Sequence, residues 1–317
     1  MKPYLLFYKT LFPRKYQNYL DRAGGNVDMC HETLLHGTFY EEYQVYGFAD
    51  KSENERRTYL TDAVRDRLCH RVNTRQGERI VANKYLTYCR LQQFYHRKTW
   101  LLQDQQTIDK VIAYGQQHGK LVVKPVDNCG GRGVQLLHAS DEYSWRTLIE
   151  HHRGQLAEEC IPQDERMAKW NHSSINTVRI NTFNRHGQIK IFTAFLLTGR
   201  DGSFVNNGAQ GGLFASIDTD NGMIFTDAYD EHGIAHSVHP DSGIPYKGEP
   251  SPCWEALVDL SKSMAENIPE MTYIGWDMAL TPDGWEPVEA NRGEFIAQQI
   301  TQGRGLRHEF ELMCGIR

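Results

Sequence analysis

The chain has 317 residues, of which 40% are hydrophobic and 24% are charged, and its formal net charge is −5. This length is sufficient for two or three packed lobes with a sizeable core. The slight negative charge argues against nucleic acid as a partner, because binding to a phosphate backbone requires a basic face.

The cysteines and the apolar segments predict a cytoplasmic protein. Seven scattered cysteines without a Cys-x-x-Cys pair are typical of free thiols in a reducing compartment. No apolar run approaches the ~20 residues that span a bilayer, and the N-terminal apolar stretch is too short for a signal peptide. Residues 2–22 interleave basic residues with aromatic residues and leucines. This pattern leaves two interpretations: a segment packed on its own domain, or a weak peripheral membrane attachment.

Residues 1–80 predict a mostly helical N-terminal lobe, because aromatic and charged residues are frequent there and strand signals are scarce. Residues 54–68 predict one amphipathic helix, with Tyr59, Leu60 and Leu68 on its apolar side. The Glu41-Glu42 pair and the charged run at 53–57 are interpreted as solvated faces.

Residues 81–160 predict a small α/β lobe. We expect a helix from Lys84 to about residue 97, and another at 107–118 with Thr107 as its cap and Gly119 as its stop. The remaining elements predicted here are strands at 121–125 and 134–137, a short helix at 145–151, and a strand at 155–162 that runs out into a connector.

Residues 161–317 predict a sheet-rich lobe, with a cleft between it and the small lobe. The expected elements are strands at 177–184, 189–198 and 213–218, a helix at 252–267, a hairpin at 273–293, a segment at 295–301 and a short C-terminal helix. His232, His236 and His239 are interpreted as part of an exposed loop rather than a metal site, because Gly233 and Pro240 accompany them.

The hairpin contains a candidate metal site. A three-residue loop at Pro282-Asp283-Gly284 would place Asp277 directly opposite Glu289, with Asn291 on the same face. Like charges placed opposite each other destabilise a strand pair, so we expect a positive group between them. Hard oxygen ligands without His or Cys suit Mg²⁺. The alternative is a solvated hairpin whose acidic side chains face water.

A second candidate site is the glycine-rich loop at 127–133, which lies between two predicted strands. Its three glycines allow the backbone to lie close to a ligand, and successive N–H groups can bind phosphate oxygens. Lys124 ends the apolar strand before this loop, and a lysine there is costly to bury unless it meets an anion. The alternatives are a plain flexible hairpin, and a lysine at a sheet edge that reaches water. Cys129 lies in this loop, but we expect the backbone rather than the thiol to be used.

The order of these features resembles the ATP-grasp superfamily: a lysine at a helix start, a Val-Val-Lys-Pro strand, a glycine-rich hairpin, a Glu-Glu-x-Ile connector, and then Asp and Glu-x-Asn on late strands. Three further stretches resemble the sugar-transfer-associated ATP-grasp proteins, namely residues 174–180, Asn207 with Gly211-Gly212, and Gly275-Trp276-Asp277 with Glu289-Ala290-Asn291. The resemblance covers about residues 80–317 well and residues 40–80 more loosely. It implies an α+β ATP-grasp fold, with a lid subdomain at 81–160 and a metal-binding subdomain at 161–317, preceded by the helical lobe.

The resemblance also implies ATP and two Mg²⁺ ions as cofactors, and roles for particular residues. Lys84 and Lys124 would hold the phosphates under a lid of Gly130, Gly131, Arg132 and Gly133. The connector would place the Glu159 carbonyl and the Ile161 N–H against adenine, Glu158 would also belong to the nucleotide site, and Glu165 or Asp164 would bind the ribose. Asp277, Glu289 and Asn291 would bind metal, and Arg179, Lys124 and Arg292 would act in catalysis.

The function that this resemblance implies is an ATP-dependent carboxylate–amine ligase that works through an acyl phosphate. Its partners would be a small-molecule or sugar carboxylate and an amine, such as an amino acid or amino sugar, in polysaccharide or glycoconjugate biosynthesis. Two alternatives remain: an ATP-grasp kinase that phosphorylates a small molecule or sugar, and a non-catalytic nucleotide-binding scaffold.

Overall fold

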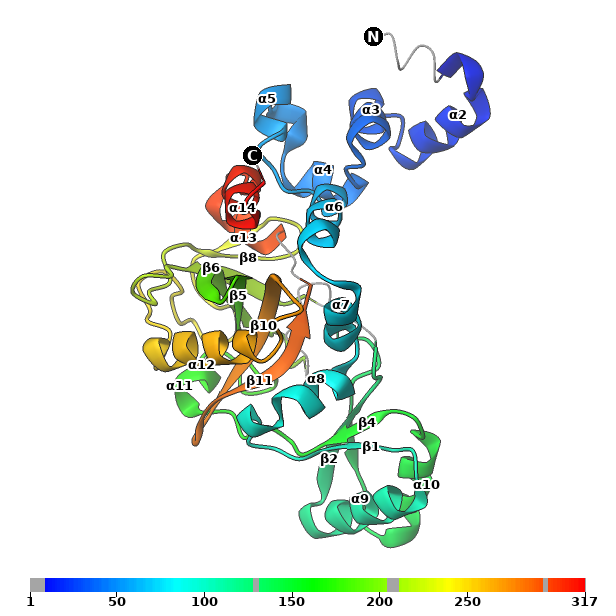
Figure 1. Cartoon of the computed structure of the whole chain (residues 1–317), viewed down its shortest axis with the longest axis vertical. Helices are drawn as coiled ribbons and strands as arrows, with labels where there is room; N and C mark the ends of the chain where they lie inside the picture. Colours follow the sequence, from blue (N-terminus) through cyan, green and yellow to red (C-terminus); the bar gives the residue numbers. More distant parts are fainter. Residues whose placement is uncertain (1–8, 128–130, 204–210, 293–295, 317) are drawn as a thin grey trace.

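The computed structural model describes residues 9–127, 131–203, 211–292 and 296–316. These residues form helices together with a four-stranded and a seven-stranded sheet, both antiparallel between all neighbouring strands. The N-terminal helices lie at one end of the long axis, the four-stranded sheet lies at the other, and the seven-stranded sheet lies between them (Figure 1). The predicted α+β class is confirmed. Among the described residues, no helix is both long and apolar enough to cross a membrane.

The N-terminal region is mostly helical, as predicted. Its elements are α2 (Pro13–Arg22), α3 (Val27–His36), α4 (Tyr40–Val45), the 3₁₀ helix η1 (Phe48–Asp50), α5 (Glu53–Arg56), α6 (Asp62–Val72) and α7 (Arg75–Ala82).

The single helix predicted at 54–68 is wrong, because α5 ends at Arg56 and α6 begins only at Asp62. The segment between them carries Leu60 into the core, where it is 1% exposed. The Gln299 side chain accepts a hydrogen bond from the Leu60 N–H at 2.7 Å and donates one to the Leu60 carbonyl at 3.1 Å. A contact with the far end of the chain therefore replaces helical hydrogen bonds that the local pattern favours.

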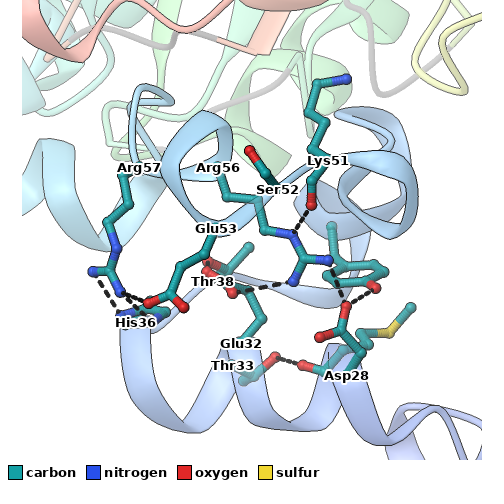
Figure 2. A network of polar contacts seen from close by, with 12 residues as sticks. Asp28, Glu32, Thr33, His36, Thr38, Lys51, Ser52, Glu53, Arg56 and Arg57 are labelled. Atoms are coloured by element: carbon teal, nitrogen blue, oxygen red, sulfur yellow. Dashed lines mark hydrogen bonds and ion pairs between the residues drawn. The ribbon is translucent and has the colours of Figure 1, made fainter.

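Arg56 is not part of a solvated face, contrary to the prediction for the run 53–57. Its guanidinium pairs with Asp28 at 2.6 Å and Glu32 at 3.4 Å, and it lies over the Tyr43 ring at 5.4 Å. Figure 2 shows how these contacts join α5 to α3, with the Lys51 carbonyl as a further acceptor. Arg56 therefore ties two helices of the N-terminal lobe together.

Glu42 also corrects the sequence interpretation, since it is 1% exposed. Its carboxylate accepts hydrogen bonds from the Phe39 N–H at 2.9 Å and the Asp62 N–H at 2.7 Å, at the starts of α4 and α6. Burial, opposed by these two hydrogen bonds, raises the pKa of Glu42 to about 7. This carboxyl group joins two helix N-termini, whereas its neighbour Glu41 is exposed.

The small sheet and its helices occupy residues 84–158. They are α8 (Lys84–Leu91), η2 (Gln92–Phe94), β1 (Thr99–Leu101), α9 (Gln105–His118), β2 (Lys120–Lys124), β3 (Gln135–His138), α10 (Glu142–His151) and β4 (Leu156–Glu158), with the strand order β1-β4-β2-β3. Apolar side chains of α9 and α10, among them Ile108, Val111 and Trp145, form a core with the sheet residues Leu121 and Val123.

Several boundaries in this lobe differ from the predictions. Helix α8 ends at Leu91 instead of near residue 97. The cap of α9 is Asp104, whose side chain accepts from the Thr107 N–H, although Gly119 ends the helix as predicted with φ of 74°. The strand predicted at 155–162 is regular only over β4, and β1 was not predicted.

The large sheet has the strand order β11-β10-β5-β6-β7-β8-β9. Its strands are β5 (Thr177–Arg185), β6 (Gln188–Thr198), β7 (Leu213–Ile217), β8 (Ala228–Tyr229), β9 (Ala235–His236), β10 (Tyr273–Thr281) and β11 (Gly284–Asn291). The accompanying helices are α11 (Glu165–Ala168), α12 (Trp254–Glu266), α13 (Ile296–Gln302) and α14 (Arg307–Cys314).

The two faces of the large sheet have different partners. Val178, Leu196 and Met278 share one face and pack in the same core as Leu257 and Met264 of α12. Alternation along each strand places Arg179, Phe195 and Asp277 on the opposite face. There Phe195 joins a core with N-terminal aromatic residues such as Tyr46, Phe48 and Tyr59. The N-terminal lobe therefore packs on the same face that carries Asp277.

His239 is wrongly predicted as exposed. It is fully buried, and its Nε2 lies 2.8 Å from the Gly199 carbonyl oxygen, while its Nδ1 accepts from the Asp241 N–H. His232 is exposed, as predicted, with 73% of its side-chain surface accessible.

Candidate nucleotide and metal site

The hairpin of β10 and β11 places the predicted metal ligands together. Asp277 pairs with Glu289, and Gly275 pairs with Asn291, as predicted. The turn itself differs, because Thr281 pairs with Gly284 and only two residues form the loop. A bulge beyond Asp277 absorbs the difference, since Met278 already pairs with Pro287. The predicted pairing is therefore right, although the loop is one residue shorter.

The positive groups expected near the two carboxylates come from the protein itself. Arg179, which is paired with Asp277 across β5 and β10, binds that carboxylate through both Nε and Nη2, the latter at 2.7 Å. The Lys84 Nζ lies 3.2 Å from Glu289 Oε1. Asn291 donates its amide N–H to Asp277 Oδ2 at 3.1 Å. We call Asp277, Glu289 and Asn291 the carboxylate row.

The carboxylate row fits Mg²⁺ as part of a larger ligand set. Carboxylate and amide oxygens are the donors that this ion prefers. Within the described residues, no group of three or more His, Cys, Asp and Glu side chains gathers around one point. The row would therefore need waters or phosphate oxygens to complete an octahedral shell, which is the usual situation for Mg²⁺ bound with a nucleotide.

Lys124, at the end of β2, finds the anion that its buried position requires. It is 6% exposed, and its Nζ lies 2.8 Å from Glu158 Oε2 and 3.5 Å from the Val288 carbonyl oxygen. Burial lowers the pKa of Lys124, and Glu158 opposes this effect. The carboxylate of Glu158, a residue predicted to belong to the nucleotide site, is bound here by Lys124.

Arg97 is a site residue that the sequence does not reveal. It is 4% exposed, and its guanidinium reaches Glu158 at 3.4 Å and Glu286 at 2.9 Å. Burial acts against its charge, but Glu158 and Glu286 outweigh this and raise the pKa of Arg97. No sequence pattern separates it from the adjacent Lys98, whose side chain is 71% exposed.

The N-terminus of α8 lies beside the glycine-rich loop. The Asn83 side chain caps the helix by accepting from the Leu86 N–H, and the Lys84 N–H donates to the Val126 carbonyl at 2.9 Å. Gly131 and Gly133 have φ values of 68° and 79°, which favour glycine. Arg132 is exposed. Cys129, Gly130 and Asn207 lie outside the described residues.

The connector after β4 carries the remaining predicted contacts. The Glu159 N–H donates to the Lys98 carbonyl, and hydrogen bonds among the described residues do not engage the Glu159 carbonyl or the Ile161 N–H. Asp164 caps α11 and pairs with Arg166 at 2.8 Å, whereas Glu165 is exposed.

Arg292 is exposed immediately after β11, and its carbonyl lies 3.9 Å from the Cys69 sulfur. The described contacts therefore do not join its side chain to the carboxylate row.

The chain has two antiparallel sheets with helices, in which Lys84 is paired with the carboxylate row of the larger sheet and Lys124 of the smaller sheet contacts the Val288 carbonyl next to that row. This is the arrangement of an ATP-grasp protein. The sequence model of the sugar-transfer associated ATP-grasp family matches residues 63–314, and the chain belongs to this family. The resemblance and the ATP-grasp fold predicted from the sequence are thus confirmed.

Several solved structures are similar to this chain at low sequence identity. The ATP-grasp ligase PsnB, complexed with a minimal precursor, is 14% identical with a TM-score of 0.46, and the match covers 77% of this chain and 62% of PsnB. D-alanyl-alanine synthetase A from Vibrio cholerae is 13% identical with a TM-score of 0.46, at 77% and 66% coverage. L-amino acid ligase from Bacillus licheniformis is 13% identical with a TM-score of 0.44, at 71% and 44% coverage. A comparison with curated protein sequences finds no significant match.

Proposed function

We propose that the chain is an ATP-dependent carboxylate–amine ligase that works through an acyl phosphate. The observation that supports this most is the 3.2 Å ion pair between Lys84 and Glu289. It brings a lysine from the helix beside the glycine-rich loop onto the carboxylate row. A phosphate-binding cation next to hard oxygen ligands suits a magnesium–nucleotide complex, and membership of the ATP-grasp family supports the same ligand.

The nucleotide would lie between the two sheets. Lys84 and Lys124 would bind its phosphates, with residues 130–133 as a lid over them. The Glu159 carbonyl and the Ile161 N–H would form hydrogen bonds with adenine. Neither group is used by the hydrogen bonds among the described residues. Glu165 is the better ribose ligand of the two candidates, because Asp164 already pairs with Arg166.

The proposed complex contains two Mg²⁺ ions, and their protein ligands would be Asp277, Glu289 and Asn291. When bound, Mg²⁺ neutralises negative charge on the transferred phosphoryl group. Arg179, together with Lys124 and Arg292, would orient that group toward the carboxylate substrate. Arg179 is suited to this role because it is held on the metal-binding face by Asp277 and lies 5.8 Å from the Phe195 ring centre.

The proposed reaction has two steps. An oxygen of the substrate carboxylate attacks the γ-phosphorus of ATP, and ADP leaves. The amine nitrogen then attacks the acyl carbon of the acyl phosphate, loses a proton, and phosphate leaves as the amide forms. A closed site would protect the acyl phosphate from water. The description of the family as sugar-transfer associated suggests an amino acid or amino sugar as a substrate, in polysaccharide or glycoconjugate biosynthesis.

The test is a screen of ADP release, with carboxylates paired against amines and with uronic acids and amino sugars included. A ligase releases ADP and phosphate only when both substrates are present. A kinase would leave phosphate on a single product, and a scaffold would release no ADP above the Glu289→Gln control. Either result would overturn the proposal.

A further inference from the structure

A buried ionic network joins the two sheets next to the carboxylate row. Arg97, which lies between α8 and β1, contacts Glu158 of β4 and Glu286 of β11, and Glu158 in turn holds Lys124 of β2. We call these four residues the Arg97 network. Each is 6% exposed or less, and Glu286 is fully buried. The network thus connects three strands whose relative positions decide where Lys124 lies.

We propose that Arg97 is a positioning residue that holds Lys124 in place for the nucleotide by fixing Glu158 to strand β11. This inference rests on the proposed role of Lys124 as a phosphate ligand. Arg97 itself would not touch the nucleotide. Its guanidinium can take this role because its planar fork of five N–H donors binds several acceptors in fixed directions.

The backbone of β11 supports the same interpretation. Arg97 Nη1 donates to the Pro287 carbonyl at 2.8 Å, while the Lys124 Nζ lies 3.5 Å from the carbonyl oxygen of Val288. Successive carbonyls of a regular strand point to opposite edges. Here the bulge between Asp277 and Met278 in the pairing of β10 with β11 leaves Val288 as the extra residue, so both carbonyls can face the small lobe. The next residue is Glu289, so Arg97 and Lys124 bind the backbone of β11 immediately before a proposed metal ligand.

The charges explain why Lys124 depends on Arg97. Glu158 and Glu286 are both buried acids, and of these two acids Lys124 forms an ion pair with Glu158. Without Arg97, Glu286 would be left as a buried carboxylate without a cation, and Glu158 would lose its tie to β11. Removing one partner of a buried pair leaves an uncompensated charge, so the surroundings must rearrange. The Tyr95 ring, 4.8 Å from the Arg97 guanidinium, further restricts where that group can lie.

The experiment compares Arg97→Met and Arg97→Lys with Arg90→Met. Arg90 is a matched control because it also forms an ion pair from the same region, with Glu270 at 3.0 Å, outside the Arg97 network. Two quantities are measured on the full chain: binding of a non-hydrolysable ATP analogue with Mg²⁺ by calorimetry, and the rate at which an amine-reactive reagent labels Lys124 without nucleotide. Exposed Lys98 serves as the internal reference for labelling.

For Arg97→Met we expect analogue binding to weaken roughly ten- to hundredfold, the range for losing a charge-assisted contact, and Lys124 to be labelled faster relative to Lys98. Arg97→Lys should fall between this variant and wild type, and Arg90→Met should match wild type. In the double variant Arg97→Met/Lys124→Met, binding should be no weaker than in Lys124→Met alone, because Arg97 acts through Lys124.

Additive losses in the double variant, or wild-type binding and labelling in folded Arg97→Met, would overturn the proposal. If Arg97→Met does not fold, Arg97→Lys decides: wild-type values for both quantities would contradict positioning. A wild-type chain that binds no analogue would overturn the proposed function instead, while the labelling rates would still test the role of Arg97.

Discussion

Lys84 and Glu289 form an ion pair of 3.2 Å, although they lie at the start of α8 and near the end of β11. Asp277 is similarly paired with Arg179. Both carboxylates proposed to bind metal are therefore balanced by cations of the chain. A divalent ion that arrived alone would have to compete with these cations, whereas a bound nucleotide would offer Lys84 its phosphates as an alternative partner. Under the proposed function, this arrangement would couple metal binding to nucleotide binding.

The first prediction concerns this competition. Lys84→Met should raise the affinity for Mn²⁺ in the absence of nucleotide about two- to tenfold, because a partly exposed ion pair is worth about 1 kcal/mol. The same variant should bind an ATP analogue more weakly than wild type. Free Mn²⁺ is measured by electron paramagnetic resonance, with Lys98→Met as the control. An unchanged Mn²⁺ affinity would show that Lys84 does not compete with the metal.

The second prediction concerns the carboxylate row. Asp277→Asn and Glu289→Gln should each reduce ATP turnover at least about a hundredfold, because each removes a charge proposed to bind the metal. The circular dichroism spectrum should be retained. Glu289→Gln is the cleaner variant, since Asp277→Asn also weakens the contact with Arg179. Wild-type turnover in either variant would exclude this row as the metal site.

The register of the β10–β11 hairpin near Asp277 could be predicted because it depends on local information. Alternation along a strand and a turn signal at Pro282-Asp283-Gly284 suffice to bring Asp277 and Glu289 together. The bulge was not predictable, and the pairing survived because the shorter loop and the extra residue cancel. The need of Lys124 for an anionic partner could be predicted for a similar reason, since a charged residue in an apolar strand requires one.

The Arg97 network could not be predicted, because its contacts are set by the tertiary fold. Arg97 and Glu158 are 61 residues apart in sequence, and Arg97 and Glu286 are 189 apart. A single sequence contains no signal that two positions so far apart will be in contact. The same reason explains Glu42 and Arg56, which look like surface charges until α3, α4 and α6 are packed together.

The third prediction concerns Lys124. Lys124→Ala should weaken binding of a non-hydrolysable ATP analogue roughly ten- to hundredfold, because a charge-assisted contact in a buried site is lost. Glu158 would keep Arg97 as its cation, so the fold should be retained. Calorimetry in the presence of Mg²⁺ provides the measurement. Wild-type affinity in both Lys124→Ala and Lys84→Ala would place the phosphates elsewhere.

The fourth prediction concerns pH and Glu42. Its pKa rises from 4.5 to about 7 on folding, so the folded state binds this proton more tightly than the unfolded state does. The resulting stabilisation is complete below about pH 4.5 and is lost as the pH rises to about 7. A shift of this size corresponds to about 3 kcal/mol.

Glu42→Gln should remove this contribution to the pH dependence of the unfolding free energy. The variant should be less stable overall, because the NH₂ group of glutamine cannot accept the second of the two N–H hydrogen bonds. Urea unfolding at pH 5 and pH 8 gives the change in unfolding free energy for each protein. The matched control is Glu41→Gln, at the exposed neighbouring position. Equal pH dependence in wild type and Glu42→Gln would contradict the assignment.

The last prediction concerns the N-terminal segment, where the sequence left two interpretations. Part of the segment packs on its own lobe, since Tyr16 is 4% exposed with its hydroxyl 3.0 Å from His31 Nε2, and Tyr40 donates to the Tyr19 carbonyl. Leu11 and Phe12 are nevertheless 54% and 51% exposed, next to the exposed basic residues Arg14 and Lys15. Each basic residue near an anionic surface contributes about 1 kcal/mol, and salt screens this attraction.

We therefore expect weak co-sedimentation with anionic vesicles at low salt, less at physiological salt, and none with neutral vesicles. The double variant Leu11→Ser/Phe12→Ser should pellet less than wild type, because it removes the apolar contacts but keeps the charge. Tyr143→Ser is the control, since Tyr143 is 80% exposed on α10, in the small lobe at the opposite end of the molecule (Figure 1). If wild type does not pellet with anionic vesicles at low salt, or if both variants pellet equally, the exposed side chains of this segment do not bind membranes and the segment serves only the N-terminal lobe.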